Sequence, residues 1–173
     1  MRNDPSHTTR KETRLDWITR EIAIGNCDDA VRLDGLRNAG IAGILSLTGW
    51  PNSANNIHGI DWRCVELIDG EGNDVIRLQQ AVWHLHELVT TRGTVLVHCM
   101  EGVSRSPLVV ASYLADTAGR AFDDCLREVA QSRGRLNIQP GLLDLRRAYE
   151  AAIQPHERIS ELALRSALPL ASE

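Results

Sequence analysis

A short apolar segment that leads into a cysteine and a glycine-containing turn constrains the fold of this chain more than any other feature. Residues 94–98 are almost wholly apolar, as expected for a strand at the centre of a sheet that is covered on both faces. Cys99 follows directly, Gly102 lies in the turn, and small and apolar residues beyond Pro107 predict a helix. This order predicts that Cys99 lies in the crevice at the carboxyl end of a sheet, where α/β proteins commonly bind ligands.

The loop after Cys99 combines the features of an anion-binding site with those of a reactive thiol. Backbone N–H groups of the loop and of the first helical turn can all point at one anion. The same positive end favours a thiolate, and reactive cysteines in such places have pKa values lowered to ~3.5–7.5. Arg105 lies six positions after Cys99, so its planar fork of donors can reach two oxygens of a phosphoryl group. We therefore predict that Cys99 is a nucleophile and that Arg105 clamps a phosphate.

The residues around this pair fit the same chemistry. Gly102 lets the backbone turn sharply and approach the anion closely. Ser106 is placed to donate its hydroxyl to the sulfur, which would stabilise the thiolate when it leaves a phosphoenzyme. Pro107 suits the first turn of a helix, where its missing N–H costs nothing. Together they predict a loop that binds a phosphoryl group beside the sulfur.

The rest of the chain alternates between strand-like and helix-like patterns. Strands are predicted within residues 18–25, 41–47, 61–68 and 94–98. Helices are predicted within residues 30–39, 78–93, 107–118, 122–133 and 141–152. Asp28 or Asp29 is expected to cap the first helix, and residues 50–59 have the composition of a loop. This alternation predicts an α/β fold with a central, mostly parallel sheet and helices on both faces.

The size and composition predict one catalytic domain with two tails. A chain of 173 residues with 43% hydrophobic content can bury a single core. Residues 14–153 carry the patterns of this domain. Residues 1–13 are predicted to be a mobile N-terminal tail, and residues 154–173 a C-terminal tail or short helix.

Composition also narrows the expected partners and compartment. The net charge of −4 and the lack of a long basic run argue against nucleic acid as a partner. The sequence has no stretch of about 20 apolar residues that would predict a membrane span, and residues 1–20 do not resemble a secretory signal. The four cysteines lack the spacing of a zinc site and the density of a disulfide scaffold. We expect a cytoplasmic monomer that uses no metal and no other cofactor.

Residues 98–106, with the sequence HCMEGVSRS, resemble the active-site loop of the dual-specificity phosphatases in the cysteine-dependent protein tyrosine phosphatase superfamily. The resemblance extends over roughly residues 15–153. It implies hydrolysis of phosphate monoesters on phosphorylated proteins through a phosphocysteine intermediate. It also implies that His98 braces the loop, and that the phosphate binds Met100, Glu101, Gly102, Val103, Ser104 and Arg105. Gly141 departs from the family, which usually has asparagine at that position.

Asp69 is the residue that the resemblance assigns as general acid, because the family places an aspartate about thirty residues before the cysteine. Asp69 lies thirty positions before Cys99, directly after a predicted strand, and Gly70 and Gly72 would let its loop close. A carboxylic acid that protonates the leaving oxygen contributes typically 10²–10⁴-fold to the rate. Asp74 is the competing candidate, but its position before a helical pattern favours an N-cap.

Several alternatives remain at this stage. A phosphoinositide or RNA 5′-phosphatase would use the same scaffold, although lysines in the loop usually favour such polyanions and this loop has Met100 and Glu101. A phosphate-binding pseudophosphatase fits less well, because Cys99, Arg105 and Asp69 are all present. A rhodanese-like sulfurtransferase also uses a cysteine loop, but the Ser-Arg-Ser-Pro sequence at 104–107 and the upstream acid loop fit a phosphatase better. The substrate class expected from the resemblance includes phosphotyrosine and phosphoserine or phosphothreonine.

Two neighbouring features suggest other roles for Cys99. His98 directly precedes Cys99, which suggests the cysteine-histidine dyad of a protease. Adjacent residues on a strand point to opposite faces, however, so bracing of the loop is the favoured role for His98. Some related phosphatases protect the nucleophile by a disulfide bond, and Cys64, on the strand before Asp69, is the candidate partner.

Overall fold

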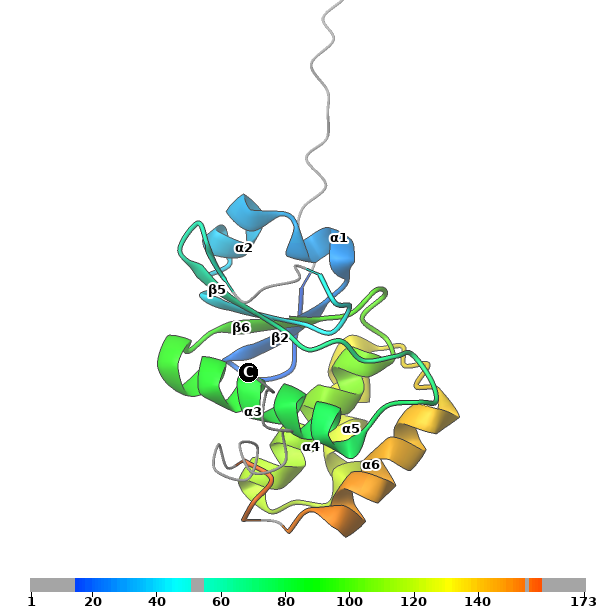
Figure 1. The fold of residues 1–173 in the computed structure, drawn as a ribbon. Helices are drawn as coiled ribbons and strands as arrows, with labels where there is room; N and C mark the ends of the chain where they lie inside the picture. The colour runs from blue at the N-terminus through cyan, green and yellow to red at the C-terminus, as the bar shows by residue number, and fades with distance from the viewer. Residues whose placement is uncertain (1–14, 51–54, 155, 160–173) are drawn as a thin grey trace, which may run out of the picture.

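A computed structural model describes residues 15–50, 55–154 and 156–159 (Figure 1). The predicted N-terminal tail and most of the predicted C-terminal tail lie outside these residues. The described strands are β1 (Asp16–Trp17), β2 (Ile22–Gly25), β3 (Gly43–Ser46), β4 (Asn55–Ile57), β5 (Ile60–Cys64) and β6 (Val95–His98). The described helices are α1 (Cys27–Ala30), α2 (Leu33–Asn38), α3 (Val75–Arg92), α4 (Arg105–Ala118), α5 (Phe122–Arg133) and α6 (Pro140–Ala152).

The strands form one sheet in the order β1-β2-β6-β3-β5-β4. Its four inner strands, β2, β6, β3 and β5, are parallel, whereas the edge strands β1 and β4 are antiparallel to their neighbours. All four residues of β6 are buried, which agrees with the apolar pattern of residues 94–98. The mostly parallel sheet that the sequence predicted is confirmed, with antiparallel strands at both edges.

Helices cover both faces of this sheet, as predicted. Helices α3, α4, α5 and α6 pack on one face, and the two short helices α1 and α2 lie on the other (Figure 1). Alternate residues of β6 supply the two cores: Val97 belongs to the larger cluster under α3 and α4, and Leu96 to the smaller cluster with Trp62. The same alternation places Cys99 on the side of the larger core and His98 on the opposite side. None of the helices in the described parts of the chain is long and apolar enough to cross a membrane.

The predicted first helix is wrong in two details. The segment forms two short helices that are interrupted at residues 31–32, and neither Asp28 nor Asp29 is the N-cap. Asn26 caps α1, since its side-chain oxygen accepts a hydrogen bond from Asp29 N at 2.9 Å. The Asp29 carboxylate in turn accepts from Asn26 N at 3.1 Å, which completes a capping box. Asp29 therefore stabilises the start of the helix from its third position.

Two further elements test local predictions. Residues 50–59 were predicted to be a loop, but Asn55–Ile57 form β4, which pairs with β5 at the edge of the sheet. The prediction of Asp74 as a cap is confirmed: its side chain accepts from Ile76 N at 2.9 Å at the start of α3.

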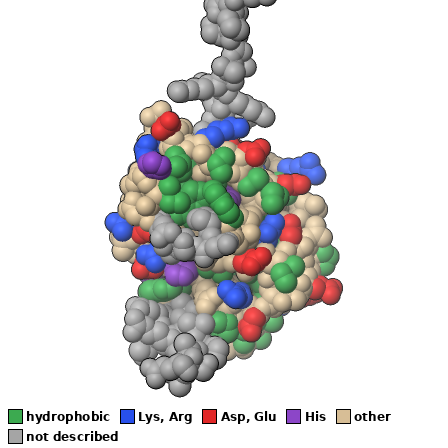
Figure 2. Space-filling model, turned by 45° about the horizontal axis from the view of Figure 1, so that its top comes forward, with side chains coloured by type: hydrophobic (Ala, Val, Ile, Leu, Met, Phe, Trp, Pro, Cys, Tyr) green, Lys and Arg blue, Asp and Glu red, His purple; other side chains and the backbone are tan. Residues whose placement is uncertain are grey.

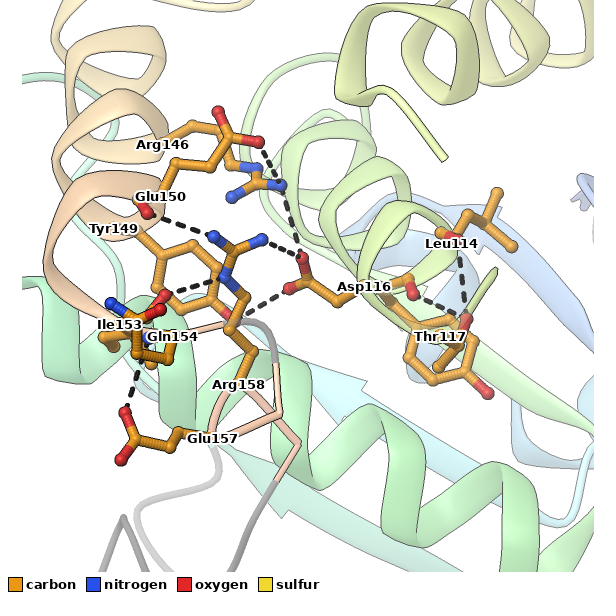
Figure 3. Close-up of polar contacts among 11 residues, drawn as sticks. Leu114, Asp116, Thr117, Arg146, Tyr149, Glu150, Ile153, Gln154, Glu157 and Arg158 are labelled. Atoms are coloured by element: carbon orange, nitrogen blue, oxygen red, sulfur yellow. Dashed lines mark hydrogen bonds and ion pairs between the residues drawn. The ribbon is translucent and has the colours of Figure 1, made fainter. Parts of the chain in front are cut away.

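A buried ionic network joins α4 and α6 to residues 156–159 (Figure 3). The Asp116 side chain is fully buried and accepts a hydrogen bond from the Tyr149 hydroxyl at 2.8 Å. Arg146 Nη2 lies 3.3 Å and Arg158 Nη1 3.2 Å from Asp116 Oδ1. Arg158 also donates to the carbonyls of Ile153 and Glu150. Residues just beyond the predicted end of the domain are thus attached to its helices.

Asp116→Ala should destabilise the fold strongly. The substitution leaves the buried guanidinium group of Arg146 and the partly buried one of Arg158 without their shared counter-charge, and breaking a buried pair in this way costs about 3–5 kcal/mol. Urea unfolding followed by circular dichroism would measure the loss. Asp144→Ala is the control, because Asp144 pairs with Arg147 on the surface, where such pairs contribute about 0.2–1 kcal/mol. Equal losses in the two variants would contradict the prediction.

Candidate active site

The loop between β6 and α4 wraps closely around the sulfur of Cys99. Cys99 is only 1% exposed, and Gly102 N donates a hydrogen bond to its Sγ at 3.2 Å. Gly102 has a φ of +71°, and a Cβ at this position would lie 2.4 Å from the carbonyl oxygen of Gly25. Both conformation and space therefore require glycine here. The prediction that Gly102 allows a sharp turn beside the anion site is consistent with this geometry.

An arginine from outside the loop holds its outer side. Arg133, the last residue of α5, donates from Nε to Gly102 O at 3.0 Å and from Nη2 to Glu101 O at 3.1 Å. Its Nη1 also contacts Asp16 of β1. Because the C=O and N–H of a trans peptide point in opposite directions, the contact with Glu101 O agrees with the direction of the following N–H, that of Gly102, toward the sulfur. Sequence reasoning missed Arg133, which carried no signal beyond its place at the end of a predicted helix.

The surroundings of Cys99 favour its thiolate. Burial alone would raise the pKa of the thiol, but the Ser106 hydroxyl and amide, the Gly102 amide and the charge of Arg105 together lower the pKa below its ordinary value. Ser106 Oγ is buried and has no well-oriented hydrogen-bond partner among the described residues, so its rotatable O–H is available to the sulfur. This arrangement places the Ser106 hydroxyl near the Cys99 thiolate, and the roles of the two residues stay predictions.

Arg105 lies at the start of α4 with its guanidinium fixed from one side. Its Nη1 donates to Leu47 O at 3.3 Å and to Leu67 O at 3.1 Å, two carbonyls that follow β3 and β5. Its Nη2 is 3.7 Å from Asp69 Oδ2. Arg105 Nε is buried without a partner among the described residues, which is costly unless a ligand accepts from it. The guanidinium is therefore oriented and has donor capacity left for an anion.

Asp69 lies beside Arg105, while Asp74 is engaged as a helix cap. The Asp69 side chain is 42% exposed, and its Oδ1 accepts a hydrogen bond from Ser104 Oγ at 2.5 Å. Ser104 Oγ also accepts from Gln139 N at 3.4 Å. The structure thus brings Cys99, Arg105 and Asp69 together, as the sequence predicted. The Ser104 hydroxyl, in contrast, contacts the carboxylate of Asp69, so only the backbone of Ser104 is free to face a phosphate.

His98 lies on the other face of the sheet from the sulfur. Its ring packs edge-on against Trp62, with 6.1 Å between the two ring centroids, and its Nδ1 is 3.4 Å from Cys99 O. Burial lowers the pKa of His98 to about 4, the contact with Cys99 O opposes this shift, and the charge of Arg105 adds to it. A neutral imidazole next to the Cys99 carbonyl fits a bracing role and gives no support to a cysteine-histidine dyad.

Cys64 faces away from Cys99. In the sheet Ser46 is paired with both Cys64 and His98, so Cys64 lies on the face that His98 occupies. All four cysteines are free, and burial raises the pKa of the Cys64 thiol. A disulfide bond between Cys64 and Cys99 would require movement across the sheet. Among the described residues, no group of His, Cys, Asp and Glu is arranged to hold a metal ion.

The rim of the site is apolar and acidic. Met100 and Ile68 are 54% and 55% exposed, and Glu101 is also exposed. Met100 Sδ lies 3.4 Å from Cys27 Sγ, which places the start of α1 beside the loop. Figure 2 shows one face of the molecule, on which hydrophobic side chains gather near the centre and acidic and basic side chains are interspersed around them.

Comparison with known proteins identifies relatives of this chain. The sequence profile "Dual specificity phosphatase, catalytic domain" matches residues 22–151. Dual specificity protein phosphatase 22-A of Danio rerio is 30% identical over 113 residues, which cover 65% of this chain and 53% of that protein. Protein-tyrosine-phosphatase IBR5 of Arabidopsis thaliana is 28% identical over 152 residues, 84% of this chain and 54% of that protein. The chain thus spans about half the length of these two relatives.

The fold also matches solved structures. A mouse putative dual specificity phosphatase, solved as a complex with zinc tungstate, superposes with a TM-score of 0.74 at 21% sequence identity. The superposition covers 90% of this chain and 98% of the mouse chain. At this level of identity the likeness establishes a common fold.

Proposed function

The chain belongs to the family of dual-specificity phosphatase catalytic domains, and on this premise we propose that it hydrolyses phosphate monoesters on proteins through a phosphocysteine intermediate. One observation carries the proposal. The buried thiol of Cys99 has a lowered pKa and accepts a hydrogen bond from its loop, and beside it lies the oriented Arg105, whose buried Nε has no partner within the described parts of the chain. A thiolate and a guanidinium in this arrangement suit the attack on a bound phosphoryl group.

The proposed reaction has two steps. The Cys99 thiolate attacks phosphorus in line with the leaving oxygen, the P–O bond breaks, and Asp69 gives its proton to that oxygen. Arg105 and the loop amides hold the other phosphoryl oxygens. A water molecule then attacks the phosphocysteine while Asp69 takes its proton. The S–P bond breaks, inorganic phosphate leaves, and the Ser106 hydroxyl stabilises the departing thiolate.

Phosphorylated proteins are the substrates that the site favours. Its exposed rim carries Met100, Ile68 and Glu101, and a carboxylate at the rim disfavours polyanions such as phosphoinositides or a 5′-triphosphate on RNA. We expect activity on phosphotyrosine and on phosphoserine or phosphothreonine. We further expect the enzyme to act as a cytoplasmic monomer without metal or organic cofactor.

A substrate panel tests this function. Phosphotyrosine, phosphoserine and phosphothreonine peptides, a phosphoinositide and a 5′-triphosphorylated RNA would be incubated with the wild-type chain and with Cys99→Ser. Phosphate release from the peptides that depends on Cys99 supports a protein phosphatase. Faster phosphate release from the lipid or the RNA would show that this molecule, and not a phosphorylated protein, represents the substrate class. Tight binding of a phosphopeptide without phosphate release would indicate a pseudophosphatase.

Ser106→Ala should shift the acidic limb of the pH dependence of kcat/KM to higher pH. The Ser106 hydroxyl lowers the pKa of Cys99, so its removal raises this pKa, and the active thiolate forms only at higher pH. Initial rates on an aryl phosphate between pH 4 and 8 would measure the shift. Ser112→Ala is a matched control, because Ser112 lies in the same helix, α4, and its Oγ is also buried without a partner among the described residues. An unmoved limb in Ser106→Ala, or an equal shift in both variants, would contradict this role.

A further inference from the structure

The loop that carries Asp69 is closed at its base by an asparagine. Asn73 Oδ1 accepts a hydrogen bond from Ile68 N at 2.7 Å, and Asn73 Nδ2 donates to Ile68 O at 2.9 Å. Nδ2 also donates to Gly70 O at 3.0 Å. We call residues 69–73 the acid loop. Its two ends are joined by these three hydrogen bonds, so the side chain of Asn73 fixes the backbone on both sides of Asp69.

The acid loop rests against Gly141, the second residue of α6. A Cβ at Gly141 would lie 2.7 Å from Glu71 N and 2.8 Å from Gly70 C, closer than real Cβ atoms approach. Both atoms belong to the backbone, so the loop as a whole would have to move. The φ of Gly141 is not in the left-handed region, which means that space and not conformation requires glycine. An asparagine at this position would be incompatible with the present position of the loop.

A third contact connects the acid loop to the phosphate-binding loop. Ser104 Oγ, one residue before Arg105, donates to Asp69 Oδ1 at 2.5 Å and accepts from Gln139 N next to α6. Gly70 and Gly72 have φ values of 153° and 93°, so the loop backbone by itself is permissive. An exposed carboxylate on such a loop keeps one position only if other groups hold it.

We propose that Asn73 and the missing side chain at Gly141 position Asp69 for proton transfer. Asn73 closes the acid loop, and Gly141 lets the loop approach α6. In this position of the loop, the Ser104 hydroxyl donates its hydrogen bond to the Asp69 carboxylate. This inference rests on the proposed function, in which Asp69 is the general acid. Neither Asn73 nor Gly141 touches the reacting atoms, so both act through Asp69.

Leaving-group dependence tests the proposal. Phenyl phosphate needs a proton on its leaving oxygen, whereas an aryl phosphate with a strongly acidic phenol does not. Because a misplacement of about 1 Å can cost on the order of 10²-fold in rate, Asn73→Ala and Gly141→Ala should lower kcat/KM for phenyl phosphate by about tenfold or more. The activated ester should change by less than about threefold in the same variants, since its departure does not depend on the acid.

A second comparison separates positioning from general damage. In an Asp69→Asn background, Asn73→Ala and Gly141→Ala should cause no further loss on phenyl phosphate, because the proton donor is already absent. Equal losses on both esters, or a loss that persists without Asp69, would overturn the proposal. Wild-type leaving-group dependence in both single variants would overturn it as well. If the wild-type chain shows no Cys99-dependent release from either ester, the proposed function itself fails.

Matched controls and a milder variant complete the test. Asn56→Ala removes an asparagine within β4 whose side chain accepts a hydrogen bond from Gly59 N at 2.8 Å, and Gly35→Ala adds a methyl group in α2. Both lie away from the acid loop and should keep wild-type leaving-group dependence. Asn73→Asp retains the acceptor for Ile68 N but loses both donated hydrogen bonds. It should show the same selective loss on phenyl phosphate, and it carries the test if an alanine variant does not fold.

Discussion

Cys99→Ser should abolish phosphate release from every substrate that the wild-type chain hydrolyses. The loop lowers the pKa of a thiol, but a serine hydroxyl in the same place stays protonated and cannot form the phosphocysteine. We expect a loss on the order of 10⁶-fold, the scale observed when the covalent nucleophile of an enzyme is removed. Release of inorganic phosphate from a phosphopeptide at saturating concentration would measure it.

Binding should survive this substitution. Arg105 and the loop amides remain in Cys99→Ser, so the variant should still bind a phosphopeptide, as calorimetry would show. Cys64→Ser is the matched control, because Cys64 lies on the other face of the sheet and should leave the rate unchanged. A chelator should also have no effect, since the nucleophile and the clamp are side chains. A Cys99→Ser protein that remains active, or turnover that depends on a metal, would defeat the mechanism.

Asp69→Asn should lower the rate on phenyl phosphate by about 10²–10⁴-fold, the usual contribution of a general acid. Asparagine keeps the size of the side chain and an oxygen that can accept from Ser104, but it has no proton to give to the leaving oxygen. An activated aryl phosphate should lose much less. The basic limb of the pH dependence of kcat/KM should flatten in Asp69→Asn, while the acidic limb, which reports Cys99, should remain.

Asp74→Ala distinguishes the two aspartates. Asp74 accepts from Ile76 N as the cap of α3, so its removal should cost about 0.5–2 kcal/mol of stability and leave the rate on both esters unchanged. Thermal unfolding and the two rate measurements would be made on the same preparations. If Asp74→Ala, and not Asp69→Asn, flattened the basic limb, the roles of cap and acid would have to be exchanged.

The sequence alone determined those elements and contacts that form between residues close together in the chain. The apolar run at 94–98, the glycine at 102 and the arginine at 105 predicted β6, the loop and α4 in the right order. The cap of α3 at Asp74 was predictable because a cap joins a side chain to an N–H group two residues away. Such contacts depend little on the rest of the molecule, so the positions of Cys99 and Arg105 in the loop could be predicted from local pattern alone.

Tertiary structure decided the features that depend on segments far apart in sequence. Arg133 holds the loop from the end of α5, Ser104 receives Asp69, and Gly141 contacts Glu71 across the site. Likewise, residues of β4 form a strand because they pair with β5. Arg158 forms an ion pair with Asp116 of α4. These side chains carry no periodicity or motif of their own, because their roles arise from the distances that packing creates between elements. Only the folded chain, in which these elements meet, shows which residue supports which.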